Sequence, residues 1–138
     1  MTTRKDICNK ALEYLNTPFH HQGRLKGIGV DCAGLIVCIA KELNLPYGDL
    51  TNYARIPDGK SLRDVLKNNA EEKSLNDSKE GDILLMKFVN EPQHVALLMP
   101  NNQIIHSYLR ARKVIIHNFD EIWKDRVVGV FEFKNIEE

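Results

Sequence analysis

The run Asp31-Cys32-Ala33-Gly34-Leu35-Ile36-Val37 sets the architecture of this chain, because it opens an apolar segment with helical spacing. The segment predicts a central, buried helix over residues 32–44, since its apolar side chains form one wide stripe: Leu35, Ile36, Ile39, Ala40 and Leu43. Asp31 is a good N-cap residue, and Gly34 leaves room for a neighbouring backbone or a substrate. Cys32 would therefore open a helix, where unpaired N–H groups lower the pKa of a thiol.

Two histidines follow far downstream, each inside a run typical of a strand. His94 begins His94–Met99, and His106 lies within Gln103–Tyr108. Pro100-Asn101-Asn102 between them is a turn signal. In an antiparallel hairpin, a loop of three or five residues puts His94 and His106 on the same face, whereas a regular two-residue loop puts them on opposite faces. We predict an odd loop, and with it a cysteine nucleophile served by two imidazoles.

The remaining pattern places helices early and strands late. A helix is expected over residues 3–16 with Thr3 as N-cap, a loop over 17–30, irregular chain over 49–60, a short helix from Ser61, and polar loop over 70–81. Residues 119–125 favour a helical turn. The expected strands are Asp82–Val89, His94–Met99, Gln103–Tyr108, Val114–Asn118 and Val127–Phe133. This order predicts one α+β domain over residues 1–138, with the N-terminal helices packed on a C-terminal antiparallel sheet of about five strands.

Composition excludes several classes of function. The chain has 138 residues, 43% of them hydrophobic, and 19 basic residues balance 19 acidic ones. A net charge of zero gives no electrostatic signature of nucleic-acid binding, and no apolar stretch is long enough for a membrane span. The N-terminus lacks the apolar core of a signal peptide. We therefore expect synthesis in the cytoplasm, with action outside it only after delivery by lysis, by a particle or by a secretion machine.

Other reactive side chains have plainer interpretations. Cys8 and Cys38 lie in apolar helical runs and are expected to be small buried hydrophobes. A zinc site made of Cys32, His94 and His106 is an alternative, but the chain offers no local ligand pair such as Cys-x-x-Cys, and we expect no metal or cofactor. His117 is expected on the surface of a strand. Three basic residues either meet a substrate carboxylate or are solvated surface charges: Arg24, Lys26 and Arg55.

At these residues the chain resembles the NlpC-type cell-wall peptidases, a branch of the papain-like cysteine peptidases. The block at residues 31–35 is similar to the nucleophile motif of that family, and residues 80–84 are similar to the start of its first core strand. Residues 94–97 and 104–107 resemble the strands that carry the base and the third polar residue. The run Thr17–Cys32 is most similar to the phage-associated branch. The resemblance covers residues 4–133.

The resemblance implies a papain-like fold and an amidase that cuts peptidoglycan stem peptides, typically after γ-linked D-glutamate, through a thioester on Cys32. His94 would act as the base and His106 would orient it. The oxyanion would lie near the Cys32 backbone N–H at the start of the helix. Asp31 either caps the helix or also contacts a free substrate amine.

One departure from the family pattern concerns the oxyanion site. The family usually has tyrosine 13 residues before the cysteine, whereas this chain has Phe19, which cannot donate a hydrogen bond. His20, Gln22 or a backbone group is the candidate replacement. The alternative function is a catalytically weak or inactive assembly component of a phage tail with the same fold. The expected partners are the stem peptide and, for a phage enzyme, tail proteins.

Overall fold

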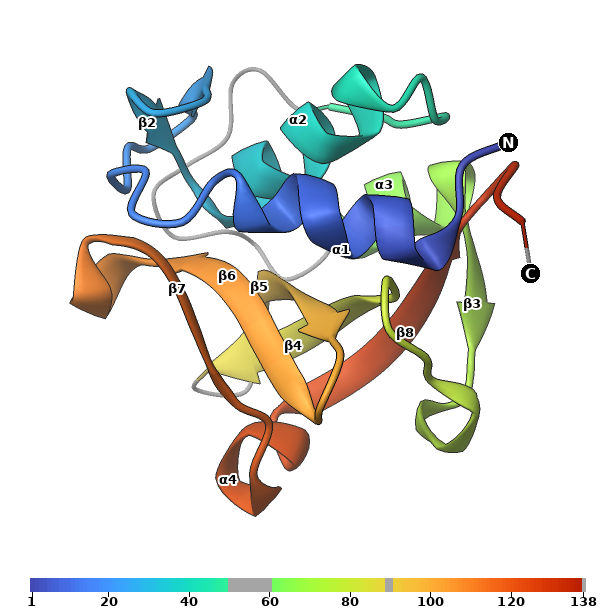
Figure 1. The fold of residues 1–138 in the computed structure, drawn as a ribbon. Coiled ribbons are helices and arrows are strands. Elements are labelled where there is room, and N and C mark those ends of the chain that lie inside the picture. Colours follow the sequence, from blue (N-terminus) through green and yellow to red (C-terminus); the bar gives the residue numbers. More distant parts are fainter. Residues whose placement is uncertain (50–60, 89–90, 138) are drawn as a thin grey trace.

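The structure, a computed structural model, describes residues 1–49, 61–88 and 91–137, and the side chains of residues 91–93 are not described. Three helices lie on one face of an antiparallel sheet: α1 (Arg4–Leu12), α2 (Cys32–Glu42) and α3 (Ser61–Asn69) (Figure 1). The short helix α4 (Glu121–Lys124) lies beyond the opposite side of the sheet (Figure 1). The irregular chain predicted for residues 49–60 falls almost entirely outside the described residues.

The main sheet has six strands in the order β3-β8-β4-β5-β6-β7, with every neighbouring pair antiparallel. Their bounds are Ala70–Lys73 (β3), Ile83–Phe88 (β4), Glu91–Met99 (β5), Gln103–Tyr108 (β6), Lys113–Asn118 (β7) and Val127–Phe133 (β8). A separate two-stranded hairpin precedes α2 and consists of β1 (Arg24–Leu25) and β2 (Gly29–Val30). Two single 3-10 turns, η1 (Leu75–Asp77) and η2 (Leu109–Ala111), complete the described elements.

The predicted α+β class is confirmed, but the strand count was too low. The sequence indicated a loop over residues 70–81, where the structure has β3 and η1. β3 is an edge strand that pairs only with β8, and its central residues Glu71 and Glu72 are exposed. An edge strand with charged side chains carries little hydrophobic alternation, which is why the sequence pattern missed it. The β1–β2 hairpin was missed for a similar reason, since its strands have two residues each.

The sheet is buried on both faces. The helix-facing core gathers side chains from all three long helices and from odd-numbered positions of the central strands, among them Ile83, Leu85, Val95, Leu97 and Ile105. The second core takes the alternate positions, as strand geometry requires: Leu84, Met86, Ala96, Leu98, Ile104, Phe119 and Val130. His94 and His106 occupy even-numbered positions of β5 and β6 and therefore belong to the second face.

Capping begins the first helix where the sequence predicted. The Thr3 hydroxyl accepts from the Asp6 N–H and the Asp6 carboxylate accepts from the Thr3 N–H, a complete capping box.

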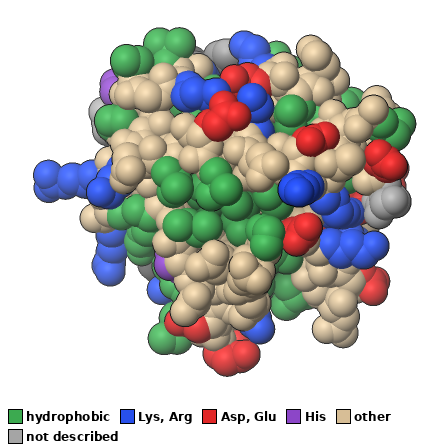
Figure 2. All heavy atoms as spheres, in the orientation of Figure 1, with side chains coloured by type: hydrophobic (Ala, Val, Ile, Leu, Met, Phe, Trp, Pro, Cys, Tyr) green, Lys and Arg blue, Asp and Glu red, His purple; other side chains and the backbone are tan. Residues whose placement is uncertain are grey.

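Basic and acidic side chains lie side by side on the face shown in Figure 2, as expected from the balanced composition. None of the described helices has the length and apolar character needed to cross a membrane.

Candidate functional site

Asp31 organises the start of α2. Its Oδ1 accepts from the Gly34 N–H at 2.8 Å and from the Arg24 guanidinium at 3.0 Å, and its Oδ2 accepts from the Gln22 N–H at 2.8 Å. The side chain is almost fully buried, with the residue 4% exposed. The predicted N-cap is thus confirmed. Because the same carboxylate also holds Gln22 and Arg24, it ties the preceding loop to the helix that carries Cys32.

Gly34 allows that loop to approach the helix closely. A Cβ atom at Gly34 would lie 2.1 Å from the carbonyl oxygen of Gly23, which no side chain tolerates. The space predicted at Gly34 is therefore used by neighbouring backbone. This contact fixes residues 20–24 against the first turn of α2.

Cys32 is the first residue of α2, and its sulfur interacts with two backbone N–H groups. Burial, reinforced by the negative charge of Asp31, raises the pKa of Cys32 to about 12, while the N–H groups of Val95 and Ala33 act in the lowering direction. The expectation that the helix start lowers this pKa was therefore wrong for the free protein, because desolvation outweighs the helix terminus. Val95 follows His94 directly, so the thiol lies against the strand that carries the predicted base.

The two predicted histidines meet on one face of the β5–β6 hairpin. Met99 pairs with Gln103 and Leu97 with Ile105, so the turn between the strands has three residues. The prediction of an odd loop is confirmed. The Nε2 atom of His94 lies 2.5 Å from the Nδ1 atom of His106, a hydrogen bond between buried rings. The rings approach edge to face, with centroids 4.8 Å apart.

A bulge precedes His94. Met86 pairs with His94 but the next residue of β4, Lys87, pairs with Pro92, so Gln93 has no partner in this register. Bulges bend a strand and redirect the side chains beside them. The irregularity lies two residues before Val95, whose backbone N–H meets the Cys32 sulfur.

Both imidazoles are held in the neutral form. Burial lowers the pKa of His94 from 6.5 to about 3, with smaller contributions from the charges of Arg126 and His117. Burial also lowers the pKa of His106, to about 2, and His94 and His117 add to the effect. The free protein therefore combines a thiol with neutral imidazoles. In this state His94 can accept a proton.

His117 extends the pair His94–His106 to three imidazoles, and the sequence pattern did not predict this. Its Nε2 atom lies 2.8 Å from Nε2 of His106, and its Nδ1 atom lies 2.9 Å from the carbonyl oxygen of Asn118. The predicted strand position is confirmed, but the side chain is half-buried against His106 and Trp123 instead of lying on the open surface. β6 and β7 are joined by four residues, since Tyr108 pairs with Lys113, and an even loop puts odd positions of β7 on the face of even positions of β6. Only the length of that loop could have revealed this.

Aromatic rings surround the histidines. Phe88 stacks on His94 with centroids 5.2 Å apart, and Tyr108 stacks on His106 at 5.0 Å. Trp123 from α4 meets His106 edge-on at 5.1 Å and lies 4.9 Å from His117. The Arg126 guanidinium lies 4.6 Å from the Trp123 ring centre. Among the described residues, the imidazoles contact each other and these rings, whereas the Cys32 sulfur meets backbone N–H groups.

The residues suggested for the oxyanion site lie in the loop before α2. Phe19 is half-buried and donates its backbone N–H to the Arg112 carbonyl at 2.8 Å. His20 is exposed, and its Nδ1 atom lies 3.0 Å from the His21 carbonyl oxygen. Gln22 supplies the backbone N–H that Asp31 accepts. The Cys32 backbone N–H lies at the first position of the helix, and its role as oxyanion donor stays a prediction.

The proposed substrate-carboxylate residues are engaged within the protein. Arg24 forms ion pairs with Asp31 and Asp49, and Lys26 forms ion pairs with Glu13 and Glu42. Arg55 lies outside the described residues. Cys8 and Cys38 are buried in the helix-facing core, as predicted.

The zinc alternative gains no support from the geometry. Within residues 1–49, 61–88 and 91–137, no three side chains of the metal-binding types are grouped to hold an ion. The nitrogen separations of 2.5 and 2.8 Å in the histidine row are hydrogen-bond distances.

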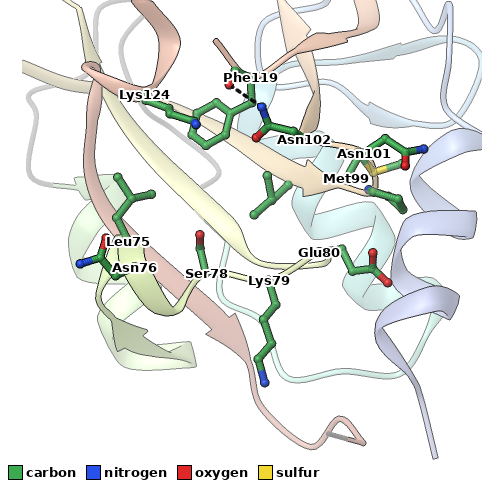
Figure 3. A pocket seen from close by; sticks show the side chains of 12 residues that line it. Leu75, Asn76, Ser78, Lys79, Glu80, Met99, Asn101, Asn102, Phe119 and Lys124 are labelled. Atoms are coloured by element: carbon green, nitrogen blue, oxygen red, sulfur yellow. Dashed lines mark hydrogen bonds between the residues drawn. The ribbon is translucent and has the colours of Figure 1, made fainter. Parts of the chain in front are cut away.

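A separate hollow of about 490 Å³ lies at the other end of the β5–β6 hairpin (Figure 3). It is lined by η1, by the turn residues Asn101 and Asn102 and by Phe119, whose carbonyl accepts from the Asn102 amide at 3.2 Å. His94 lies at the opposite end of β5, five residues from Met99, which is roughly 16 Å along a strand. The hollow contains none of the predicted site residues.

The helices packed on an antiparallel sheet form the papain-like α+β fold of NlpC/P60 domains, and the comparisons agree. The profile of the NlpC/P60 family matches residues 16–132, so the chain belongs to the NlpC/P60 family. Whether it belongs to the phage-associated branch stays a prediction.

Individual relatives show how far the similarity extends. The chain is 28% identical over 120 residues to dipeptidyl-peptidase 6 of Lysinibacillus sphaericus, covering 86% of this chain but 37% of the relative. It superposes on NlpC2 of Trichomonas vaginalis with a TM-score of 0.74 at 17% identity, covering 96% of this chain and 48% of that one. The peptidoglycan hydrolase RipB of Mycobacterium tuberculosis gives a TM-score of 0.64 at 19% identity, with coverages of 94% and 63%. The chain thus spans little more than a third of the curated relative's length.

Proposed function

We propose that this domain is a cysteine endopeptidase that hydrolyses an amide bond in peptidoglycan stem peptides. The observation that carries the proposal is the hydrogen-bonded pair His94–His106. Val95, the residue after His94 on the same strand, meets the Cys32 sulfur through its backbone N–H. Family membership supports the reaction class, and the peptidoglycan hydrolases among the structural relatives support the substrate.

The first half of the reaction forms a thioester. Because Cys32 is a thiol and His94 a neutral base in the free protein, the proton moves from sulfur to His94 Nδ1 as the sulfur attacks the amide carbonyl. The Sγ–C bond forms and the carbonyl oxygen becomes an oxyanion. His94 then gives the proton to the amide nitrogen, the C–N bond breaks, and the amine leaves.

The second half releases the acid. Water gives a proton to His94 and its oxygen attacks the thioester carbonyl. The S–C bond breaks, and the proton returns from His94 to the Cys32 sulfur. His106 keeps the His94 ring oriented through both halves, since its Nδ1 atom holds His94 Nε2 at 2.5 Å.

Oxyanion stabilisation is the point at which this site differs from the family pattern. The Cys32 N–H is available at the helix start, but Phe19 supplies no hydroxyl. Loss of one oxyanion donor typically costs roughly 10²–10³ in rate. We therefore propose that the enzyme is slow and that Phe19→Tyr raises its rate. The bond that we propose it cuts is the one after γ-linked D-glutamate.

The test is digestion of purified peptidoglycan by the wild type, Cys32→Ala and the matched control Cys38→Ala, with the fragments identified by mass. We expect the wild type and the Cys38 variant to release the same stem fragments and the Cys32 variant to release none. Circular dichroism checks that each variant is folded. Identical fragment patterns from the wild type and Cys32→Ala would remove the enzyme proposal.

A silent domain is the second candidate, and Phe19 is the observation that favours it. On that hypothesis, neither the wild type nor Phe19→Tyr releases fragments. The domain would then serve as an assembly component, for which a phage tail is the proposed setting.

A further inference from the structure

We propose that His117 is a positioning residue that fixes the direction of the hydrogen bonds through a row of three imidazoles and thereby leaves the Nδ1 atom of His94 unprotonated. The inference deepens the proposed function and rests on it for its catalytic meaning. The three rings come from three successive strands, β5, β6 and β7, and share the sheet face that also holds the second core.

The direction of the row is set at its outer end. The Asn118 carbonyl oxygen can only accept, so the hydrogen of the 2.9 Å contact must lie on His117 Nδ1. In its neutral form, the form that the proposal concerns, His117 then has a lone pair on Nε2. Since His106 Nε2 lies 2.8 Å away, His106 must be the donor in that contact.

The same logic carries inward to His94. With its hydrogen on Nε2, neutral His106 has a lone pair on Nδ1, and this nitrogen accepts from His94 Nε2 at 2.5 Å. Neutral His94 is then left with a lone pair on Nδ1. In the proposed reaction, this is the nitrogen that takes the proton of Cys32. Every contact of the row is satisfied by this one arrangement of hydrogens.

Without His117, the pair His94–His106 does not determine which of its two nitrogens donates the hydrogen bond. His106 is fully buried and His94 is 5% exposed, so water cannot readily set the tautomer. Either nitrogen of the 2.5 Å contact could carry the hydrogen, and in the reversed arrangement His94 Nδ1 is protonated and cannot act as a base. The wrong tautomer of a catalytic histidine lowers the turnover of serine proteases by about 10⁴. His117 is itself held by the Trp123 ring, 4.9 Å away.

The test compares an acceptor and a donor at position 117. Glutamate can only accept when ionised, so His117→Glu keeps the native direction; lysine can only donate, so His117→Lys reverses it. Imidazole ¹⁵N NMR at pH 8 reads the tautomers directly. We expect Nε2–H on His94 and His106 in the wild type and in His117→Glu, and Nδ1–H on both in His117→Lys. Lys113→Ala, an exposed position on the same strand, is the matched control.

Kinetics separate this proposal from the proposed function. We expect kcat on peptidoglycan to fall at least about tenfold in His117→Lys, with KM unchanged and with activity largely kept in His117→Glu. A wild type with Nδ1–H on His94, or tautomers that are the same in the Lys and Glu variants, would overturn the role of His117 even if the enzyme is active. Expected tautomers in a wild type that cuts nothing would instead overturn the proposed function. If the Lys variant does not fold, the wild-type and Glu spectra still decide.

Discussion

Replacing His106 by glutamine should change how the stability of this protein depends on pH. His94 and His106 stay neutral in the folded protein down to pH values near 3 and 2, whereas each titrates near 6.5 in the unfolded chain. Between these limits the unfolded chain binds more protons, so the free energy of unfolding falls as the pH falls. At pH 5, the free energy of unfolding is lower than at high pH by RT ln(1 + 10^1.5), which is about 2 kcal/mol for each histidine. The two histidines together therefore lower the free energy of unfolding by about 4 kcal/mol at pH 5. Native proteins typically have a free energy of unfolding of only about 5–15 kcal/mol, so this is a large part of the total.

Urea unfolding followed by far-ultraviolet circular dichroism at pH 8 and pH 5 measures this loss. We expect the wild type to lose about 2 kcal/mol more between the two pH values than His106→Gln does, because glutamine cannot take up a proton. His20→Gln removes an exposed imidazole outside the row and should lose as much as the wild type. Equal losses in the wild type and His106→Gln would refute the assignment of a neutral, buried His106.

Three further substitutions test contacts around the site. Asp31→Ala removes the N-cap of α2 and the carboxylate that holds Gln22 and Arg24. Thermal unfolding should show that the free energy of unfolding falls by about 3 kcal/mol. Asp31→Asn can still cap the helix and should lose less. Ser107→Ala removes a 2.7 Å hydrogen bond to the buried Val30 carbonyl. The free energy of unfolding measured in urea should fall by about 1–2 kcal/mol, and an unchanged value would mean that water replaces the hydroxyl. Thr3→Ala breaks the capping box of α1 and should cost about 1 kcal/mol by the same measurement, whereas Thr3→Ser should cost much less.

The local pattern located most elements because each carries its own signal. The wide apolar stripe after Asp31 is sufficient to predict α2, and Pro100-Asn101-Asn102 between two apolar runs is sufficient to predict the β5–β6 hairpin with both histidines on one face. Charged or very short strands carry no such signal, so β3 and the β1–β2 hairpin were not predicted.

The ionisation of the site depended on burial, which the residue pattern does not contain. A helix start predicts a lowered thiol pKa, yet packing of α2 against β5 raises the pKa of Cys32 to about 12. Burial of His94 likewise determines that it is neutral, and no neighbouring residue in the sequence signals this.

Cys32, His94 and His106 could be predicted as candidate site residues from residue type, helix capping and strand parity, since these depend on neighbours along the chain. His117 could not, because its face is set by the number of residues between β6 and β7 and by the register that the tertiary fold selects. The direction of the imidazole row has the same origin. It is fixed by the carbonyl oxygen of Asn118, a group that every residue carries, and only the folded backbone brings it within 2.9 Å of the imidazole that begins the row.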